Sequence, residues 1–269
     1  MGEIMKVSLI LPSFKRPKLL DLGLFSLAQQ KINHDLEVFV LNDGIGDDTE
    51  NICNKYKDKL NIKYIFTGQR NLNGEIIFRC PSYAYNIGIK QSKGEIIILS
   101  CPEIYHLNNS INYLIKPLIN NKRILSTLNP KNLFFDNTEE VTNYIIEKLT
   151  TNLPKNMIPL LESNTKRCRY ATKLPFFMGM YKKELVDIGG YDEDFTGFAC
   201  DDDDLVGRLK LKGLKYYEGD AKIIHLYHDK QYNRKNLSKD ERYLHNWKLL
   251  KERKGIIIRN KDREWGVMK

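Results

Sequence analysis

Short apolar runs alternate with helical patterns along the first part of the chain. Strands are expected at 7–11, 36–41, 62–66 and 96–99, and helices at 17–30, 47–59 and 82–91. Strands that alternate with helices pair in parallel, because each connecting helix packs back onto the sheet. The sequence therefore predicts an α/β fold built on a mostly parallel, doubly wound sheet.

The second part of the chain continues this pattern less regularly. Residues 129–173 form an asparagine-rich, partly helical insertion whose role is left open. After them we expect a strand at 176–181, a short helix at 182–188, a helix from the acidic segment to Lys212, a strand near Ile223 and a final helix at 238–251. One continuous domain is expected, with a larger half at 1–128 and a smaller half at 174–269 that ends in a helical tail.

The composition is that of a globular protein with a sizeable core, since 42% of the 269 residues are hydrophobic. The net charge of +9 is spread along the chain rather than gathered in one helix or arm, so we expect no nucleic-acid partner. Two local basic excesses, at 166–169 and 251–269, could meet a diphosphate or an anionic membrane surface. Solvated side chains on an exposed face are the commoner explanation.

The five cysteines are odd in number and include no Cys-x-x-Cys pair, which argues against a disulfide framework or a zinc finger. We expect most of them to pack as small apolar side chains. The first residues contain no apolar stretch long enough for a signal peptide or a membrane span. A cytoplasmic location is therefore expected, with peripheral contact at the inner face of the membrane left open.

Four consecutive aspartates, Asp201–Asp204, precede the apolar run at 205–211. Adjacent carboxylates repel one another, so such a run needs a cation, a helix N-terminus or a substrate hydroxyl to balance it. The unpaired N–H groups of a helix N-terminus account for one or two of the four. We expect the others to take part in chemistry, and we expect Asp204 to lie on a less engaged face of the helix.

Several polar residues fall where the expected parallel strands end. Pro12 and Ser13 follow the first strand, Asp43 follows the second, and the segment 100–103 follows the strand at 96–99. Ligands of open α/β sheets bind beyond the carboxyl ends of the strands. These positions therefore mark the expected ligand-binding edge.

Over residues 7–228 the order of these motifs resembles the family-two glycosyltransferases, which have the GT-A fold. The opening run VSLILPSF resembles the family's first strand, so Pro12 and Ser13 are implied to contact the nucleotide. The turn LNDG resembles the family's Asp-Asp-Gly turn. The resemblance implies that Asp43 binds the base of a uridine diphosphate (UDP) sugar.

The same resemblance implies a metal site after the fourth strand. Arg79 and Asn86 match the family's arginine-to-asparagine helix and are implied to contact the nucleotide. The family's Asp-x-Asp motif should follow, but Cys101-Pro102-Glu103 stands there, so Glu103 is the implied ligand of a manganese or magnesium ion. Cys101 could favour zinc as a soft ligand, although a cysteine that packs at the strand end is the preferred interpretation.

Two histidines near the end of the matched region complete the implied metal site. His225 and His228 lie where the family draws its remaining protein ligands, and His225 is the preferred one. Histidines three apart face opposite sides of a strand, so both can bind only if the strand ends at His225. A stacking or surface role fits His228 and His106 better than it fits His225.

The acidic run resembles the catalytic region of the galactosyltransferase branch, in which an aromatic residue, two small residues and several acids appear in the same order. The resemblance implies that Asp202 is the general base, with acidic neighbours that raise its proton affinity. It also implies that Asp201 hydrogen-bonds acceptor hydroxyls. Three aromatic residues could stack on sugar rings or equally pack in the core: Tyr191, Phe195 and Phe198.

The sequence is thus interpreted as an inverting glycosyltransferase that moves a sugar from a UDP-sugar to a glycan or glycolipid acceptor, as in surface polysaccharide biosynthesis. Residues 1–128 would bind the nucleotide sugar, and residues 174–269 would bind the acceptor. A non-catalytic nucleotide- or glycan-binding module stays an alternative, because Cys101 interrupts one motif. A sugar nucleotidyltransferase is less favoured, because 12–16 contains no glycine for a phosphate loop.

Overall fold

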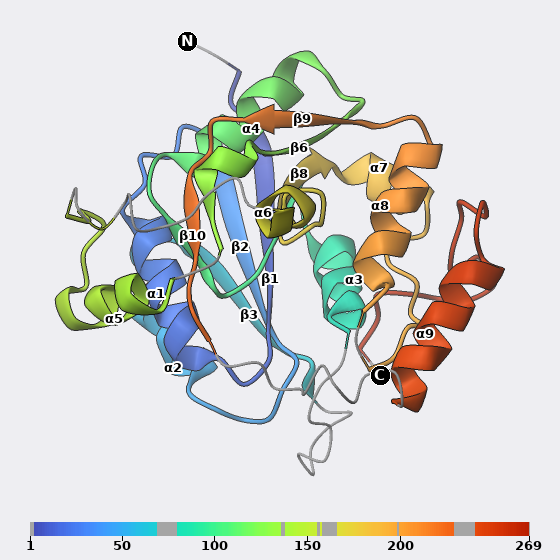
Figure 1. Cartoon of the computed structure of the whole chain (residues 1–269), viewed down its shortest axis with the longest axis horizontal. Helices are drawn as coiled ribbons and strands as arrows, with labels where there is room; N and C mark the ends of the chain where they lie inside the picture. The colour runs from blue at the N-terminus through green and yellow to red at the C-terminus, as the bar shows by residue number, and fades with distance from the viewer. Residues whose placement is uncertain are drawn as a thin grey trace.

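A seven-stranded sheet forms the centre of the protein (Figure 1). The computed structural model describes residues 3–68, 80–135, 138–154, 157, 166–197, 199–228 and 240–268. The strands stand in the order β3-β2-β1-β4-β8-β6-β9. Their bounds are β1 Lys6–Ser13, β2 Asp35–Asn42, β3 Asn61–Phe66, β4 Ile96–Ser100, β6 Ile124–Leu128, β8 Phe177–Tyr181 and β9 Lys215–Gly219. Only β8 runs antiparallel to its neighbours, so the predicted mostly parallel sheet is confirmed.

Helices cover both faces of this sheet (Figure 1). Leu9 and Leu11 of β1 pack with α1, α2 and α4, whereas Ile10 packs with α3, α7 and α8. The bounds are α1 Pro17–Ala28, α2 Thr49–Lys55, α3 Ser82–Gln91, α4 Ser110–Asn120, α7 Lys182–Asp187 and α8 Asp201–Leu211. Side chains alternate between the faces of a strand, so a strand covered on both faces is mostly apolar. This explains why four of the five residues at 7–11 are apolar; the fifth, Ser8, is buried and donates a hydrogen bond of 2.5 Å to Glu37.

β1 runs two residues beyond the expected strand and includes Pro12 and Ser13. Pro12 pairs with Leu41 of β2, whereas β4 accompanies β1 only as far as Ile10. Proline lacks a backbone N–H, which a strand tolerates where it has lost one neighbour. The expectation that the strand stops at Pro12 is therefore wrong.

A second sheet of three strands, in the order β5-β10-β7, lies beside the main one. It contains β5 (Ile104–His106), β7 (Leu133–Phe134) and β10 (Ile223–His225), with β5 and β10 antiparallel. The insertion at 129–173 contributes β7, together with a 3-10 turn η2 (Pro130–Asn132), α5 (Glu139–Lys148) and α6 (Lys166–Ala171). Through this small sheet, β7 of the insertion pairs with β10, which in turn pairs with β5.

The basic C-terminal segment packs into the fold after α9 (Glu241–Glu252). Trp265 joins the core cluster between α3 and α8, and the Arg259 N–H donates to the Ile188 carbonyl at 2.9 Å. The Arg259 side chain is only 4% exposed. Part of this segment is therefore structural, and solvation alone does not account for its basic residues.

Among the described residues no helix combines the length and apolar character needed to cross a membrane.

Candidate active site

The carboxyl ends of β1 and β2 meet at one edge of the main sheet. The Asp43 N–H donates to the Ser13 carbonyl at 2.8 Å. The Ser13 hydroxyl is buried and finds no hydrogen-bond partner among the described residues. Buried polar groups are normally paired, so this hydroxyl has hydrogen-bonding capacity left for a ligand.

Asp43 lies in a turn that neighbouring side chains hold in place. Its carboxylate accepts a hydrogen bond of 2.6 Å from Thr67 and is almost entirely buried. The Asn42 side chain accepts from the Gly44 N–H at 3.1 Å and donates to Asp47 at 3.1 Å. The position of the carboxylate at the sheet edge is thus set by the turn itself.

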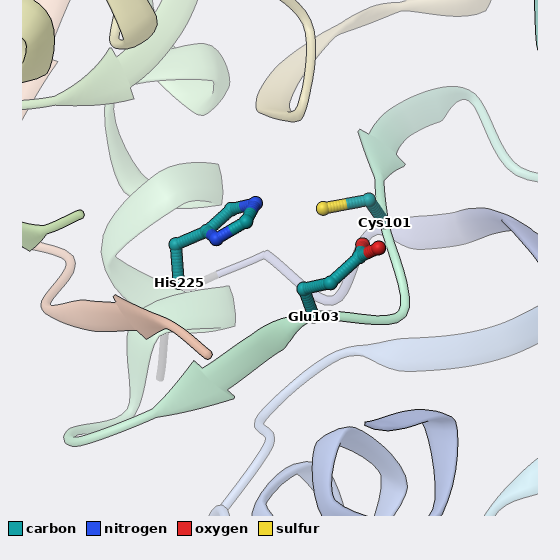
Figure 2. A group of neighbouring side chains, drawn as sticks. All are labelled: Cys101, Glu103 and His225. Carbon is teal, nitrogen blue, oxygen red and sulfur yellow. The ribbon is translucent and has the colours of Figure 1, made fainter. Parts of the chain in front are cut away.

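Cys101, Glu103 and His225 point towards one another from two separate parts of the chain (Figure 2). One sulfur, one carboxylate oxygen and one ring nitrogen lie within 4.8 Å of one another. The backbone brings them together, because His225 pairs with Ile104 and the Leu226 N–H donates to the Glu103 carbonyl at 2.8 Å. Donors of these types at this spacing fit a divalent ion. We call these three residues the metal cluster.

Arg16 and His228 lie against the carboxylate of the metal cluster. The Arg16 guanidinium pairs with Glu103 and lies 3.3 Å from His228 Nε2, which is 3.9 Å from Glu103. β10 ends at His225, so the condition under which both histidines can face one site is met. Arg16 was not among the predicted site residues, although its position directly after β1, three residues beyond Ser13, could have indicated it.

His225 also stacks on an aromatic ring. Its imidazole lies 4.2 Å from the Phe135 ring, and the Arg167 guanidinium lies 4.2 Å from the same ring. Burial lowers the pKa of His225 to about 3, and His228, Arg16 and Arg167 add to the shift. The imidazole is therefore neutral, as a metal ligand must be. His225 therefore both stacks on an aromatic ring and faces the metal cluster, although these two roles were predicted as alternatives.

His106 lies outside the metal cluster. It is buried, packs edge-on against Phe177 at 5.4 Å, and its Nδ1 lies 2.6 Å from the Ser110 hydroxyl. The stacking role expected for His106 agrees with this environment.

Asp203 and Asp204 of the acidic run have opposite surroundings. Asp203 is exposed and accepts a hydrogen bond of 3.1 Å from Tyr170. Asp204 is buried and pairs with Arg208 at 2.7 Å and with Arg259 at 2.7 Å. The expectation that Asp204 lies on a less engaged helix face is therefore wrong, because a remote arginine reaches it from the C-terminal segment.

Asp201 and Asp202 begin α8, and among the described residues neither is paired with an arginine. Asp201 is buried, and one of its carboxylate oxygens has no hydrogen-bond partner among the described residues. Burial raises the pKa of Asp201 to about 6. Burial and the charge of Asp201 raise the pKa of Asp202 well above its ordinary value, against a hydrogen bond of 3.1 Å from Tyr191. A raised pKa suits a group that must accept a proton near neutral pH.

The acidic run and the metal cluster belong to one electrostatic environment. Burial raises the pKa of the Cys101 thiol to about 12, with Arg16 opposing and the charge of Asp202 adding to the shift. Tyr85 and Tyr191 connect the two groups, with parallel rings 5.1 Å apart. The Tyr85 hydroxyl donates to the Ser100 carbonyl at 2.7 Å, directly ahead of Cys101.

The loop before α8 carries backbone strain. Ala199 and Cys200 adopt φ values of 71° and 75°, and Lys15, beside Arg16, has a φ of 56°. Residues other than glycine seldom occupy this left-handed region, and such strain gathers at functional sites. The strained residues thus lie directly before Asp201 and directly before Arg16.

Asn86 lies beneath the loop rather than at the sheet edge. Its buried amide donates to the Tyr191 carbonyl at 2.9 Å and to Glu193 at 3.0 Å, and it accepts from the Tyr191 N–H at 2.8 Å. Asn86 therefore holds Tyr191 in place, and a direct contact with a nucleotide gains no support from this geometry. Tyr191 and Phe195 are buried core residues. Arg79 and Phe198 lie outside the described residues.

Two family models match the chain. The model described as glycosyl transferase family 2 matches residues 8–185, and the one described as the N-terminal domain of galactosyltransferase matches residues 160–230. Chondroitin synthase of Escherichia coli is 26% identical over 238 residues, which are 78% of this chain and 33% of that protein. Chondroitin synthase of Pasteurella multocida is 27% identical over 237 residues, which are 77% of this chain and 23% of that protein. The chain thus spans about a third or less of the length of these relatives.

Solved structures share the fold at low sequence identity. Staphylococcus aureus TarS 1–349 in complex with UDP-GlcNAc matches 84% of this chain and 60% of its own, with a TM-score of 0.56 and 21% identity. GalNAc-T7 with UDP, GalNAc and Mn²⁺ matches 93% of this chain and 48% of its own, with a TM-score of 0.64 and 12% identity.

Proposed function

This chain belongs to glycosyl transferase family 2, and we propose that it transfers a sugar from a UDP-sugar to a hydroxyl group of a glycan or glycolipid. Its fold is the GT-A fold implied by the sequence. One observation carries the proposal. Beyond the ends of the parallel strands, the charge of Asp202 acts on Cys101 of the metal cluster. The UDP-GlcNAc bound by TarS and the names of the two chondroitin synthases support a UDP-sugar donor and a polysaccharide acceptor.

The donor would bind along the ends of β1 and β2. Asp43 would accept a hydrogen bond from the base, and the open hydroxyl of Ser13, next to Pro12, would contact the nucleotide. Arg16 and Arg167 place two guanidinium groups near the metal cluster. Guanidinium groups pair well with phosphates, so these arginines are suited to the diphosphate.

Glu103 and His225, with His228 beside them, would hold a divalent ion, which supplies a Lewis acid for the departing diphosphate. In the family pattern this ion is manganese or magnesium. Glu103→Ala and His225→Ala should each weaken the metal-dependent part of UDP binding. Calorimetry with and without the ion measures that part, and wild-type metal dependence in both variants would place the ion elsewhere.

Asp202 would accept the proton of the acceptor hydroxyl. Its raised pKa and the Tyr191 hydrogen bond, which fixes one carboxylate oxygen, support this role. Asp201 would hydrogen-bond the acceptor beside it. A single base acting opposite the leaving group gives an in-line displacement with inversion at the anomeric carbon.

The test compares Asp202→Asn with Asp203→Asn, which changes an exposed neighbour in the same helical turn. If Asp202 is the base, its variant should bind UDP normally and lose about a hundredfold or more in transfer rate. The Asp203 variant should keep transfer close to wild type. Equal rates in both variants would refute the assignment.

The wild-type chain should also be screened by thermal shift against nucleotide sugars with and without manganese, since a ligand of the folded state raises the melting temperature. UDP binding without transfer or hydrolysis would favour the non-catalytic module. A cytoplasmic location and contact with the inner face of the membrane stay predictions.

A further inference from the structure

The metal cluster contains a sulfur donor in addition to the two ligands expected from the sequence. Cys101 lies at the end of β4, two residues before Glu103, and its Sγ faces Glu103 and His225 (Figure 2). Glu103 is buried and the other two side chains are partly exposed. The three donor atoms thus face one another across a common space.

Cys101 packs against the core cluster that contains Leu9 and Leu11, and packing alone does not account for its other neighbours. The other four cysteines are buried, whereas Cys101 is partly exposed and approaches two further ligand-type side chains. A packing role was predicted for Cys101 because it lies at the end of a strand. The third residue, His225, comes from a strand far along the chain, so the sequence around Cys101 could not reveal the cluster.

The chemistry of the three donors differs from that of an all-oxygen site. Manganese and magnesium favour carboxylate, carbonyl and water oxygens, whereas thiolate and imidazole favour zinc and similar softer ions. A tetrahedral zinc site with three protein donors keeps one position for an oxygen of water or substrate. The set of one sulfur, one oxygen and one nitrogen fits this pattern.

We propose that Cys101 is a metal ligand and that the metal cluster prefers a zinc-type ion to manganese or magnesium. The inference rests on the proposed function only for the place of the ion beside the donor diphosphate. The sulfur donor and the resulting ion preference depend on the cluster alone.

Arg16 must be part of this account, because its guanidinium pairs with Glu103. The guanidinium would have to leave this carboxylate oxygen for a cation to bind there, since like charges repel. In the metal-only titration the guanidinium would turn to solvent, whereas in the donor complex the diphosphate would receive it.

The first measurement uses the 269-residue chain after removal of metal, titrated with zinc, manganese and cobalt salts. We expect one zinc per chain and tighter binding of zinc than of manganese. Bound cobalt should give the absorption of a thiolate-to-cobalt charge transfer. This readout needs no enzymatic activity and no variant.

The second measurement uses variants of Cys101. Loss of an outer hydrogen-bond partner typically lowers metal affinity by about 10- to 100-fold, so Cys101→Ala should lower zinc affinity by at least that factor and abolish the cobalt band. If Cys101→Ala does not fold, the same measurements are made on Cys101→Ser. Cys53→Ala removes a buried thiol of α2 and should leave both readouts unchanged. Cys101→Asp restores an oxygen donor and should shift the preference towards manganese.

The proposal is overturned if cobalt binds without a thiolate band, if the Cys101 variants bind zinc as tightly as the wild type, or if the wild type prefers manganese. Failure of the proposed function gives a different result. In that case zinc and cobalt bind as expected, but UDP-sugars neither bind nor react. If transfer depends on Asp202 but Cys101→Asp keeps the metal selectivity of the wild type, only the inference about Cys101 is refuted.

Discussion

The Tyr191 hydroxyl donates a hydrogen bond of 3.1 Å to Asp202 from a ring with no solvent exposure. This bond stabilises the ionised carboxylate and opposes the rise of its pKa that burial and Asp201 cause. The ring is held by stacking on Tyr85 and by the Asn86 amide. The protonation state of the proposed base is therefore set partly from the core.

Tyr191→Phe should raise the pKa of Asp202 further, because it removes the donor and leaves the ring. The ionised base would then require a higher pH, so the acid limb of the kcat/KM profile should move to higher pH. Tyr85→Phe is the matched control, because its hydroxyl contacts the Ser100 carbonyl instead. An unchanged acid limb in Tyr191→Phe would show that this bond does not tune the base.

Asp201→Asn should stabilise the protein at neutral pH. The pKa of Asp201 is raised to about 6 in the folded protein, so the stability contributed by its protonation is complete below its unfolded pKa and lost as pH rises through about 6. At pH 7 the variant should gain up to roughly 3 kcal/mol in the free energy of unfolding, and most of this gain should be lost by pH 4. Denaturant titrations at both pH values measure it. A loss of stability at pH 7 would contradict the prediction.

Asp204→Asn should destabilise the fold by about 3 kcal/mol or more, because it leaves the buried Arg208 and Arg259 without their shared carboxylate. Asp203→Asn, at an exposed position, should stay within about 0.5 kcal/mol of the wild type. Urea unfolding of the two variants compares them directly. Equal stabilities would mean that the paired arginines find other partners.

Asp43→Ala should weaken UDP binding without unfolding the protein. The Asp43 carboxylate lies just beyond the end of β2 and accepts a hydrogen bond from the buried Thr67 hydroxyl, so its removal leaves the strands of the sheet intact. Calorimetry gives the affinity, and circular dichroism checks the fold. Wild-type affinity in a folded variant would remove Asp43 from the donor site.

Local sequence patterns were sufficient for the regular elements of the main sheet. The helix expected at 82–91 is α3, and the strands at 7–11, 36–41 and 96–99 are the central strands β1, β2 and β4. These segments are buried on both faces, so their apolar composition indicates where they lie in the fold. β5, α4, β6 and β9 were not assigned; β9 is mostly exposed and polar, and α4 contains Pro117.

The amino-acid sequence was enough to predict the fold class, the sheet edge proposed to bind ligand, and the acids and histidines of the candidate site. Each of these follows from periodicity, from strand ends or from motif order along the chain. The three-dimensional arrangement was needed to show that Asp204 is paired with two arginines and that Cys101, Glu103 and His225 lie together. Arg259 reaches Asp204 from the C-terminal segment, and β10 carries His225 to Cys101. Charge and coordination depend on distances in space, and residues far apart in the chain set those distances here.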